Sequence, residues 1–295
     1  MELRVLQYFL TVVREENISR AAEALHVTQP TLSRQLSQLE DELGKQLFVR
    51  GKHLTLTDAG IMLRRRAEEV VKLMGKIDEE FREQEEVTGI ITIGSGGQIS
   101  AAALPEIMEG FRKKHPKVQY EFYTNNADHI KEQLDRGLLD FGLLLEPIDI
   151  GKYDYLRMPE VERWGIFMRK DDPLAQKEAI TRDDLRGLPL ITTNRLSLQR
   201  EIANWFGDKF GELNIFASYN IITNVAMLVE HGTARALTIE GAVNLFDPER
   251  LTFRPLYPEL TMTSVFAWKR YSPMFGAAGR FLEYFKSIQF RHILV

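Results

Sequence analysis

The chain has 295 residues, no cysteine and a formal net charge of −4 at pH 7. Without cysteine, disulfide bonds, thiolate nucleophiles and cysteine-ligated zinc sites are excluded. The slightly negative charge argues against a general nucleic-acid coat, which would be basic throughout, but it allows a small DNA-binding module with local positive charge.

The N-terminal segment lacks the pattern of a secretory signal. Glu2 places a negative charge where a signal peptide has a basic n-region, and Gln7 and Thr11 interrupt the apolar stretch. No small-residue cleavage site follows. No apolar run reaches the roughly 18 residues that a membrane-spanning helix needs. We therefore expect a cytoplasmic protein of two or three domains with no membrane partner.

Three helices are predicted within the first 44 residues. Apolar residues recur at helical spacing from Leu3 to Val13. A second, shorter helix is predicted from Arg20 to Leu25, with Asn17 and Ser19 suited to cap its start. The third begins after a turn at 26–28 and is expected to bury leucines spaced 4-3-4, namely Leu32, Leu36, Leu39 and Leu43.

The ends of the third helix are marked by their residue types. Thr28 is suited to cap it, Pro30 fits its first turn, and Gly44 suits its end. Helices two and three together form a helix–turn–helix pattern, whose second helix enters the major groove of DNA. The alternative is a plain two-helix hairpin with a solvated face.

The outward face of the third helix carries side chains that can read DNA. Arg34 can contact a phosphate or a guanine, Gln29 or Gln35 can pair with adenine, and Thr31 can touch a thymine methyl group. We predict DNA contacts from one set of residues in this region: Ser19, Thr28, Gln29, Pro30, Thr31, Ser33, Arg34 and Gln35.

A short hairpin is predicted next. Leu54 and Leu56 alternate with Thr55 and Thr57, and Gly51 allows a turn. Three residues at the tip would grip the DNA backbone as a cationic wing, namely Arg50, Lys52 and His53. A solvated hairpin is the alternative.

This region resembles the winged helix–turn–helix of the LysR-type transcriptional regulators. The resemblance lies in FLTVVREENISRAAEALHVTQPTLSRQLSQLEDELGKQLFVR, followed by LTLTDAG. Its residues agree with the family at fixed spacing over some sixty positions. The wing departs from the family by being about one residue shorter, with His53 near a place often held by arginine.

A long helix is predicted from Asp58 to about Val87. Apolar residues spaced 4-3-4-3-4 form a heptad seam, namely Leu63, Ala67, Val70, Met74, Ile77 and Phe81. We interpret the seam as a dimerisation surface, as the resemblance also implies; packing on its own domain is the alternative. A dimer would present two recognition helices to a roughly palindromic site on double-stranded DNA. The resemblance further implies a homotetramer and contact with RNA polymerase.

Strand-like and helix-like stretches alternate from residue 89 onward, which predicts parallel sheets with helices on both faces. The resemblance implies a two-lobed effector domain similar to periplasmic binding proteins. We place the chain crossings near Glu160–Glu162 and Val265–Trp268. The predicted domains are 1–58 (DNA-binding), 59–88 (linker helix) and 89–295 (effector-binding), with lobe I at about 89–161 and 267–295 and lobe II at about 162–266. The fold class is thus α/β with an N-terminal all-α, winged-helix domain.

A ligand pocket is expected between the lobes, at strand C-terminal ends and helix N-termini. The polar residues at these places include Gln98, Ser100, Thr124, Asn125, Thr193 and Asn224. The resemblance implies that positions matching Gln98, Ser100, Thr124 and Thr193 line the effector site. Arg195 could supply a counter-charge to a small anion. For each residue, an ordinary helix cap or turn is the alternative.

Catalytic and metal-binding patterns are absent. The glycine-rich GSGGQIS lacks the Lys-Ser/Thr ending of a P-loop, the six histidines show no metal-ligand spacing, and no nucleophile elbow occurs. We expect a transcription regulator without a cofactor, controlled by a small-molecule effector. A solute carrier is disfavoured by the N-terminal helix–turn–helix, and an enzyme by the lack of a catalytic constellation.

Overall fold

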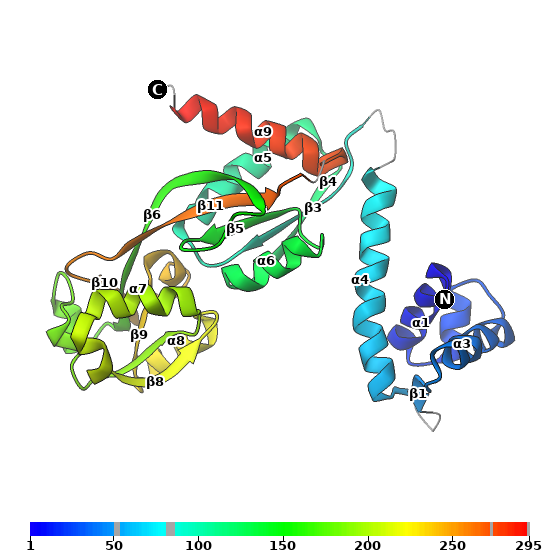
Figure 1. Cartoon of the computed structure of the whole chain (residues 1–295), viewed down its shortest axis with the longest axis horizontal. Coiled ribbons are helices and arrows are strands. Elements are labelled where there is room, and N and C mark those ends of the chain that lie inside the picture. The colour runs from blue at the N-terminus through cyan, green and yellow to red at the C-terminus, as the bar shows by residue number, and fades with distance from the viewer. Residues whose placement is uncertain (50–53, 81–85, 272–273, 294–295) are drawn as a thin grey trace. The chain divides into compact units, whose positions relative to one another are not determined.

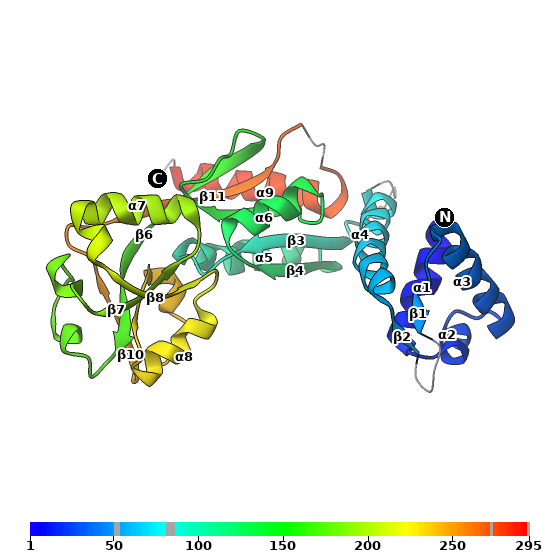
Figure 2. The same cartoon turned by 60° about the horizontal axis from the view of Figure 1, so that its bottom comes forward.

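The computed structural model describes residues 1–49, 54–80, 86–271 and 274–293. The chain packs as two units, Met1–Arg82 and Glu83–Val295, each with its own hydrophobic cores. Both units are drawn in Figures 1 and 2. Within the described residues no helix is both long and apolar enough to cross a membrane.

The N-terminal unit contains the predicted helices and hairpin. Its elements are α1 (Leu3–Glu15), α2 (Ile18–Ala24), α3 (Gln29–Leu43), β1 (Phe48–Val49), β2 (Thr55–Leu56) and α4 (Asp58–Glu80). Strands β1 and β2 pair antiparallel. One core joins α1, α2 and α3, with Phe9, Leu32 and Leu39 at its centre.

Local signals set the helix ends. The Asn17 side chain accepts hydrogen bonds from the backbone N–H groups of Ser19 and Arg20, so α2 begins two residues earlier than predicted, and Ser19 lies inside it. The Thr28 side chain caps α3, and Gly44 ends it in the left-handed conformation with φ 62°. Leu43 was predicted to face inward; it is 40% exposed, because it lies in the last turn beyond the core.

A buried carboxylate fastens α3 to the start of the hairpin. The Oε1 atom of Glu40 accepts hydrogen bonds from the N–H groups of Leu47, at 2.7 Å, and Phe48, at 3.3 Å. We expect Glu40→Ala to lower the opening free energy of the N-terminal unit by about 2 kcal/mol, since two buried N–H groups lose their acceptor. Hydrogen exchange of the α1–α3 amides in the full chain measures this. The exposed Glu42→Ala is the control; equal effects of the two variants would contradict the assignment.

Only part of the long helix α4 is exposed and available for dimerisation. Ala67 is 1% exposed and belongs to the core of its own unit, and Leu63 packs against that core. Predicting Ala67 in a dimer seam was therefore wrong, because α4 lies against α1 at this level. Val70, Met74 and Ile77 are exposed. Phe81 lies outside the described residues.

The C-terminal unit consists of two lobes that share one continuous sheet. Lobe I contains β3 (Gly89–Ser95), η1 (Ile99–Ala103), α5 (Leu104–Lys114), β4 (Val118–Thr124), α6 (Ala127–Asp135), β5 (Phe141–Leu145) and α9 (Gly276–Ile293). Helices α5 and α9 cover one face of its sheet, and α6 covers the other, as Figure 1 shows. A separate core lies behind each face.

Lobe II repeats this layering. Its elements are η2 (Pro173–Gln176), η3 (Asp183–Leu185), β7 (Pro189–Thr193), α7 (Leu196–Phe206), η4 (Gly207–Glu212), β8 (Asn214–Tyr219), α8 (Thr223–His231), β9 (Arg235–Ile239), η5 (Glu240–Val243) and β10 (Leu251–Pro255). Helix α7 packs into one core and α8 into another.

Two long strands connect the lobes: β6 (Tyr153–Arg169) and β11 (Thr261–Lys269). They pair antiparallel, and the described strands follow the order β4-β3-β5-β11-β6-β9-β7-β8, with β10 along β6. Pairs within each lobe, such as β3–β4 and β7–β8, are parallel. The predicted parallel pairing is thus found within each lobe, while the pairing at the centre is antiparallel, because both crossings are themselves strands that run in opposite directions.

The two crossings differ in how well they were predicted. Strand β6 leaves its pairing in lobe I and joins β9 from Trp164 onward, so the crossing near Glu160–Glu162 lies where expected. In β11, Ser264–Ala267 already pair with β5 of lobe I, which places the crossing at 261–263. The expected Val265–Trp268 is therefore a few residues late. The domain boundaries proposed above stay predictions.

Candidate functional site

The recognition helix α3 presents its predicted face to solvent. Gln29, Pro30, Thr31 and Arg34 are exposed, and Ser33 and Gln35 are partly exposed. Within the described residues the Arg34 guanidinium has no hydrogen-bond or ion-pair partner, so it is available for a phosphate or a base. A side chain that is already committed to a protein partner would have to break that contact first.

Other members of the predicted set already have local roles. The hydroxyls of Thr28 and Thr31 are 2.8 Å apart and hydrogen-bonded, and the Gln35 amide donates to Gln38 Oε1 at 3.2 Å. Ser19 is exposed near the start of α2. Arg50, Lys52 and His53 lie outside the described residues, so their contacts stay predictions.

A pocket of about 250 Å³ lies between the two lobes of the C-terminal unit. Lobe I supplies the segment after β3, the end of β4 and the start of α6; lobe II supplies the ends of β7 and β8 and the starts of α7 and α8. These are strand C-terminal ends and helix N-termini, which is where open α/β sheets bind ligands.

Five of the seven predicted effector residues line this pocket: Gln98, Thr124, Asn125, Thr193 and Arg195. The other two do not. Ser100 is fully buried in η1, and Asn224 is exposed on α8, where its neighbour Thr223 lines the pocket instead. The helical phase places Thr223 rather than Asn224 on the inner side, which strand–helix patterns alone did not reveal.

The pocket wall is largely apolar, which the sequence did not indicate. Its apolar members include Leu145, Trp164, Leu198, Ile222, Ile239 and Phe246. They come from separate segments between residues 145 and 246, so no sequence window reveals them together. Among the pocket-lining residues the one charged side chain is Arg195.

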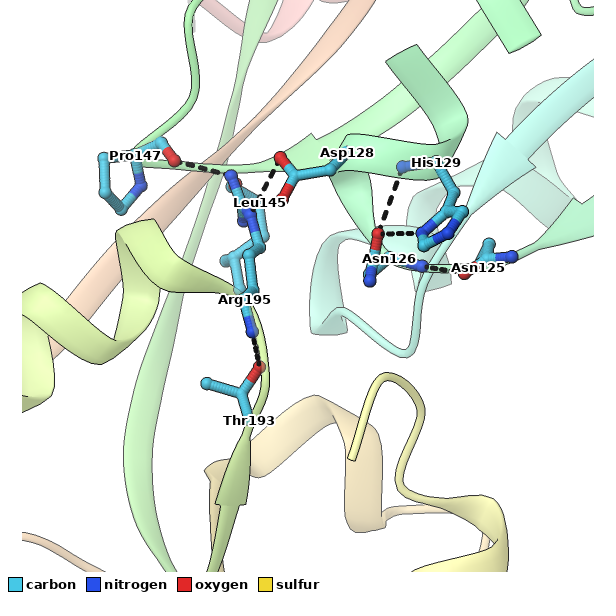
Figure 3. Close-up of polar contacts among 8 residues, drawn as sticks. All are labelled: Asn125, Asn126, Asp128, His129, Leu145, Pro147, Thr193 and Arg195. Carbon is cyan, nitrogen blue, oxygen red and sulfur yellow. Dashed lines mark hydrogen bonds and ion pairs between the residues drawn. The ribbon is translucent and has the colours of Figure 1, made fainter. Parts of the chain in front are cut away.

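Arg195 ties the lobes together. The Arg195 side chain belongs to lobe II, at the N-terminus of α7. Its guanidinium donates to two carbonyl oxygens in lobe I, that of Leu145 at 2.7 Å and that of Pro147 at 2.5 Å. Its Nε also lies 3.4 Å from Asp128 Oδ1 at the start of α6 (Figure 3). Burial lowers the pKa of Arg195, while Asp128 acts in the opposite direction.

These contacts give Arg195 a structural role that the sequence did not indicate. The side chain is 2% exposed, and its donors are directed at protein oxygens. It acts as a bond between the lobes at the edge of the pocket. The carbonyl oxygens are neutral, so the positive charge of Arg195 stays at the pocket, and its role as counter-charge to an anion stays a prediction.

A second interlobe contact lies beside the pocket, at Glu162 on β6. This side chain is 0% exposed, and its Oε1 accepts from the backbone N–H group of Ile99 in lobe I. The N–H groups of Ser100 in lobe I and Gly241 in lobe II also act on its pKa. Burial raises the pKa of Glu162 to about 7, although the three N–H groups act to lower it. The sequence pattern placed this residue at the crossing but gave no sign of its contacts.

Comparisons with family models and with known proteins point to the same family. Residues 3–61 match the model described as "Bacterial regulatory helix-turn-helix protein, lysR family", and residues 84–288 match "LysR substrate binding domain". The Hca operon transcriptional activator HcaR of Escherichia coli (strain K12) is 31% identical over 282 residues, which cover 92% of each chain.

Solved structures show the same fold. CbnR, a LysR family transcriptional regulator, aligns with a TM-score of 0.73 at 22% identity, covering 97% of this chain and 99% of its own. CbnR complexed with its target DNA aligns with a TM-score of 0.72 at 21% identity, with the same coverage. At this identity the likeness extends to the fold alone.

Proposed function

This chain belongs to the LysR family of bacterial regulators, and on that premise we propose that a small molecule bound between its lobes changes how the protein engages promoter DNA. The chain is a DNA-binding transcription regulator with an effector-binding domain, and it is not an enzyme. The observation that carries the proposal is the interlobe pocket, which is lined by residues of both lobes, Arg195 among them.

A ligand in such a pocket contacts both lobes at once. Its binding energy can therefore favour one lobe spacing over another, and a ligand shifts an equilibrium only by its differential affinity for the two states. We propose that this shift is passed to the DNA-binding units of an oligomer. An effector that left both footprint and DNA bend unchanged would contradict this coupling.

We propose self-association through the exposed part of α4. Val70, Met74 and Ile77 follow each other at a 4-3 spacing and leave apolar side chains in solvent. Two recognition helices would then meet half-sites about one helical turn apart on a roughly palindromic promoter site. We also propose that the protein forms a homotetramer, contacts RNA polymerase and is located in the cytoplasm.

Arg34→Ala tests the DNA-binding face. We expect it to weaken binding at the specific site by about 1–3 kcal/mol if Arg34 reads a base, and to weaken binding on all sequences about equally if it holds a phosphate. The measurement is a footprint and titration on DNA flanking the protein's own gene at fixed salt. The control is Arg4→Ala on α1. Unchanged affinity in Arg34→Ala would remove this residue from the interface.

A further inference from the structure

The two lobes meet backbone to backbone at one side of the pocket. The chain after β3 in lobe I faces η5 of lobe II, and a Cβ atom added to Gly241 would lie 2.2 Å from the Ile99 nitrogen and 2.7 Å from the Gln98 carbonyl carbon. A Cβ atom on Gly97 would lie 3.1 Å from the Ala242 Cα atom. At Gly241 any side chain would force the lobes apart, so glycine here permits the closed spacing.

The carboxyl group of Glu162 is buried at this contact. Its Oε1 accepts from the Ile99 N–H group, and the side chain is 0% exposed. Among the described residues, Oε2 has no hydrogen-bond partner. A buried carboxylate with one oxygen unpaired is costly, whereas the protonated group carries no charge that must be taken out of water. The closed contact therefore favours the protonated form of Glu162.

The surroundings of Glu162 do not compensate for a negative charge. The residues that face it from other elements are Ile99 and Ser100 of η1, Met262 of β11, and Glu240 and Gly241 of η5. The charged one is Glu240, which has the same sign as ionised Glu162. Arg163, the next residue along β6, is hydrogen-bonded to Glu240 at 2.7 and 2.8 Å. Within the described residues no ion pair would thus keep an ionised Glu162 between closed lobes.

The pairing of the two crossing strands is interrupted close to this carboxyl group. Thr263 of β11 pairs with Val161 of β6, and Val265 pairs with Arg157, so one residue of β11 lies opposite three of β6. One of these three is Pro159, which has no backbone N–H group to donate. A bulge disrupts the ladder locally, so the strands bend here at less cost than in a regular ladder. The lobes can therefore change their spacing about this point.

We propose that a proton on Glu162 holds the two lobes closed, and that its loss to solvent lets them separate about the bulge, so that water reaches the ionised carboxylate. The pocket between the lobes would widen in the same step. The inference concerns lobe spacing and needs no effector; it becomes regulatory through the proposed function, in which lobe spacing acts on the DNA-binding units.

The direction of the pH dependence follows from proton linkage. Burial raises the pKa of Glu162 to about 7, whereas the ordinary value for a hydrated carboxyl group is 4.5. Between these values the closed state binds more protons than the open state does. The ratio of open to closed molecules should therefore rise by up to about tenfold per pH unit. Above the higher value both states are ionised, and the ratio should become constant.

Spin labels on either side of the contact measure the lobe spacing in the full chain. The chain has no cysteine, so Ala102→Cys in η1 and Asn244→Cys just after η5 place one label in each lobe at exposed positions. Excess unlabelled chain keeps the measured pairs within one molecule. Electron paramagnetic resonance should show the distance between the labels shifting to longer values as pH rises from 5 to 8. In Glu162→Gln it should stay short throughout, while the exposed Glu106→Gln should keep the shift.

A glycine variant tests the contact without titration. Gly241→Ala should hold the lobes apart even at pH 5, because its Cβ atom cannot fit against the Ile99 nitrogen. The control is Gly211→Ala in the same lobe, since a Cβ atom there meets no other atom within 4 Å. A short distance at pH 5 in Gly241→Ala would overturn the inference.

The labelled chain with Glu162 intact can overturn the inference without any folded variant. A distance that stays constant from pH 5 to pH 8, or that shortens, rejects the proton-controlled contact. The same shift in Glu162→Gln would also reject it, since another group would then be titrating. The promoter footprint at one fixed pH, with Arg34→Ala beside it, tests the regulator function separately. A clear footprint with a constant lobe spacing would retain the regulator and reject the role of the proton.

Discussion

Replacing Arg195 by methionine is expected to lower the free energy of unfolding of the C-terminal unit by about 3 kcal/mol. Methionine keeps an unbranched apolar stem but removes the guanidinium, so the carbonyl oxygens of Leu145 and Pro147 lose their donors. A buried polar group without a partner costs about 1–3 kcal/mol. Since two such groups are orphaned, the loss should be well above that of an ordinary surface substitution.

Asp128→Asn is the matched variant, because it alters the charged partner and leaves the two carbonyl bonds. Asp128 is 58% exposed and 3.4 Å from Arg195 Nε, so we expect a change below about 1 kcal/mol. Urea unfolding followed by tryptophan fluorescence measures both variants. All three tryptophans, Trp164, Trp205 and Trp268, lie in the C-terminal unit, so the signal reports this unit alone. Equal effects of the two substitutions would show that the ion pair, not the carbonyl bonds, holds the lobes.

Replacing Glu162 by glutamine is expected to stabilise the protein increasingly as pH rises from 5 to 8. The pKa of Glu162 is raised to about 7 in the folded chain from an ordinary value of 4.5. The folded state therefore holds the proton more tightly than the unfolded state does. Above pH 4.5 the unfolded chain releases this proton first, so the wild type loses stability until the pH passes the folded pKa near 7.

The size of this effect follows from the shift. At 1.36 kcal/mol per pKa unit, the difference between variant and wild type should grow by about 2–3 kcal/mol between pH 5 and pH 8. Glutamine keeps an acceptor for the N–H group of Ile99 but cannot ionise. The neighbouring charges are Glu240, which also raises the pKa of Glu162, and Arg163, which is hydrogen-bonded to Glu240.

The control for this experiment is Glu106→Gln, an exposed residue at the start of α5. Urea midpoints at several pH values, read by the same tryptophan signal, give the difference curves. A flat difference between Glu162→Gln and wild type over this range would mean that the carboxylate ionises in the folded state as easily as in water. The interlobe contact would then hold the lobes together independently of pH.

The N-terminal unit could be predicted in detail because its signals are local. The Thr28 cap, Pro30 in the first turn and Gly44 at the end of α3 each act within one helical turn. The wrong predictions concern residues whose burial depends on another element of the unit and not on their own helix. Leu43 repeats the heptad but lies beyond the core, and Ala67 fits a dimer seam but packs under α1.

The C-terminal unit was predicted as a set of elements rather than as an arrangement. The alternation of strand-like and helix-like stretches predicted parallel pairing, which is found within each lobe. It gave no sign that β6 is one strand running through both lobes, because a strand that changes lobes has no single burial pattern. Tyr153–Arg169 is buried alternately in its first half and continuously in its last part.

By itself, the sequence determined the helix–turn–helix, the exposed face around Arg34, the α/β class and most of the polar pocket residues, whereas the two-lobed form was implied by the resemblance. These follow from spacing and residue type, which act over a few positions. Only the tertiary structure decided what those residues do together. It directed Arg195 to the carbonyl oxygens of the other lobe, buried Glu162 among N–H groups of both lobes and left Gln98 Oε1 without a donor. Each of these contacts joins segments roughly 45 or more residues apart, and their energies depend on burial, which no local pattern encodes.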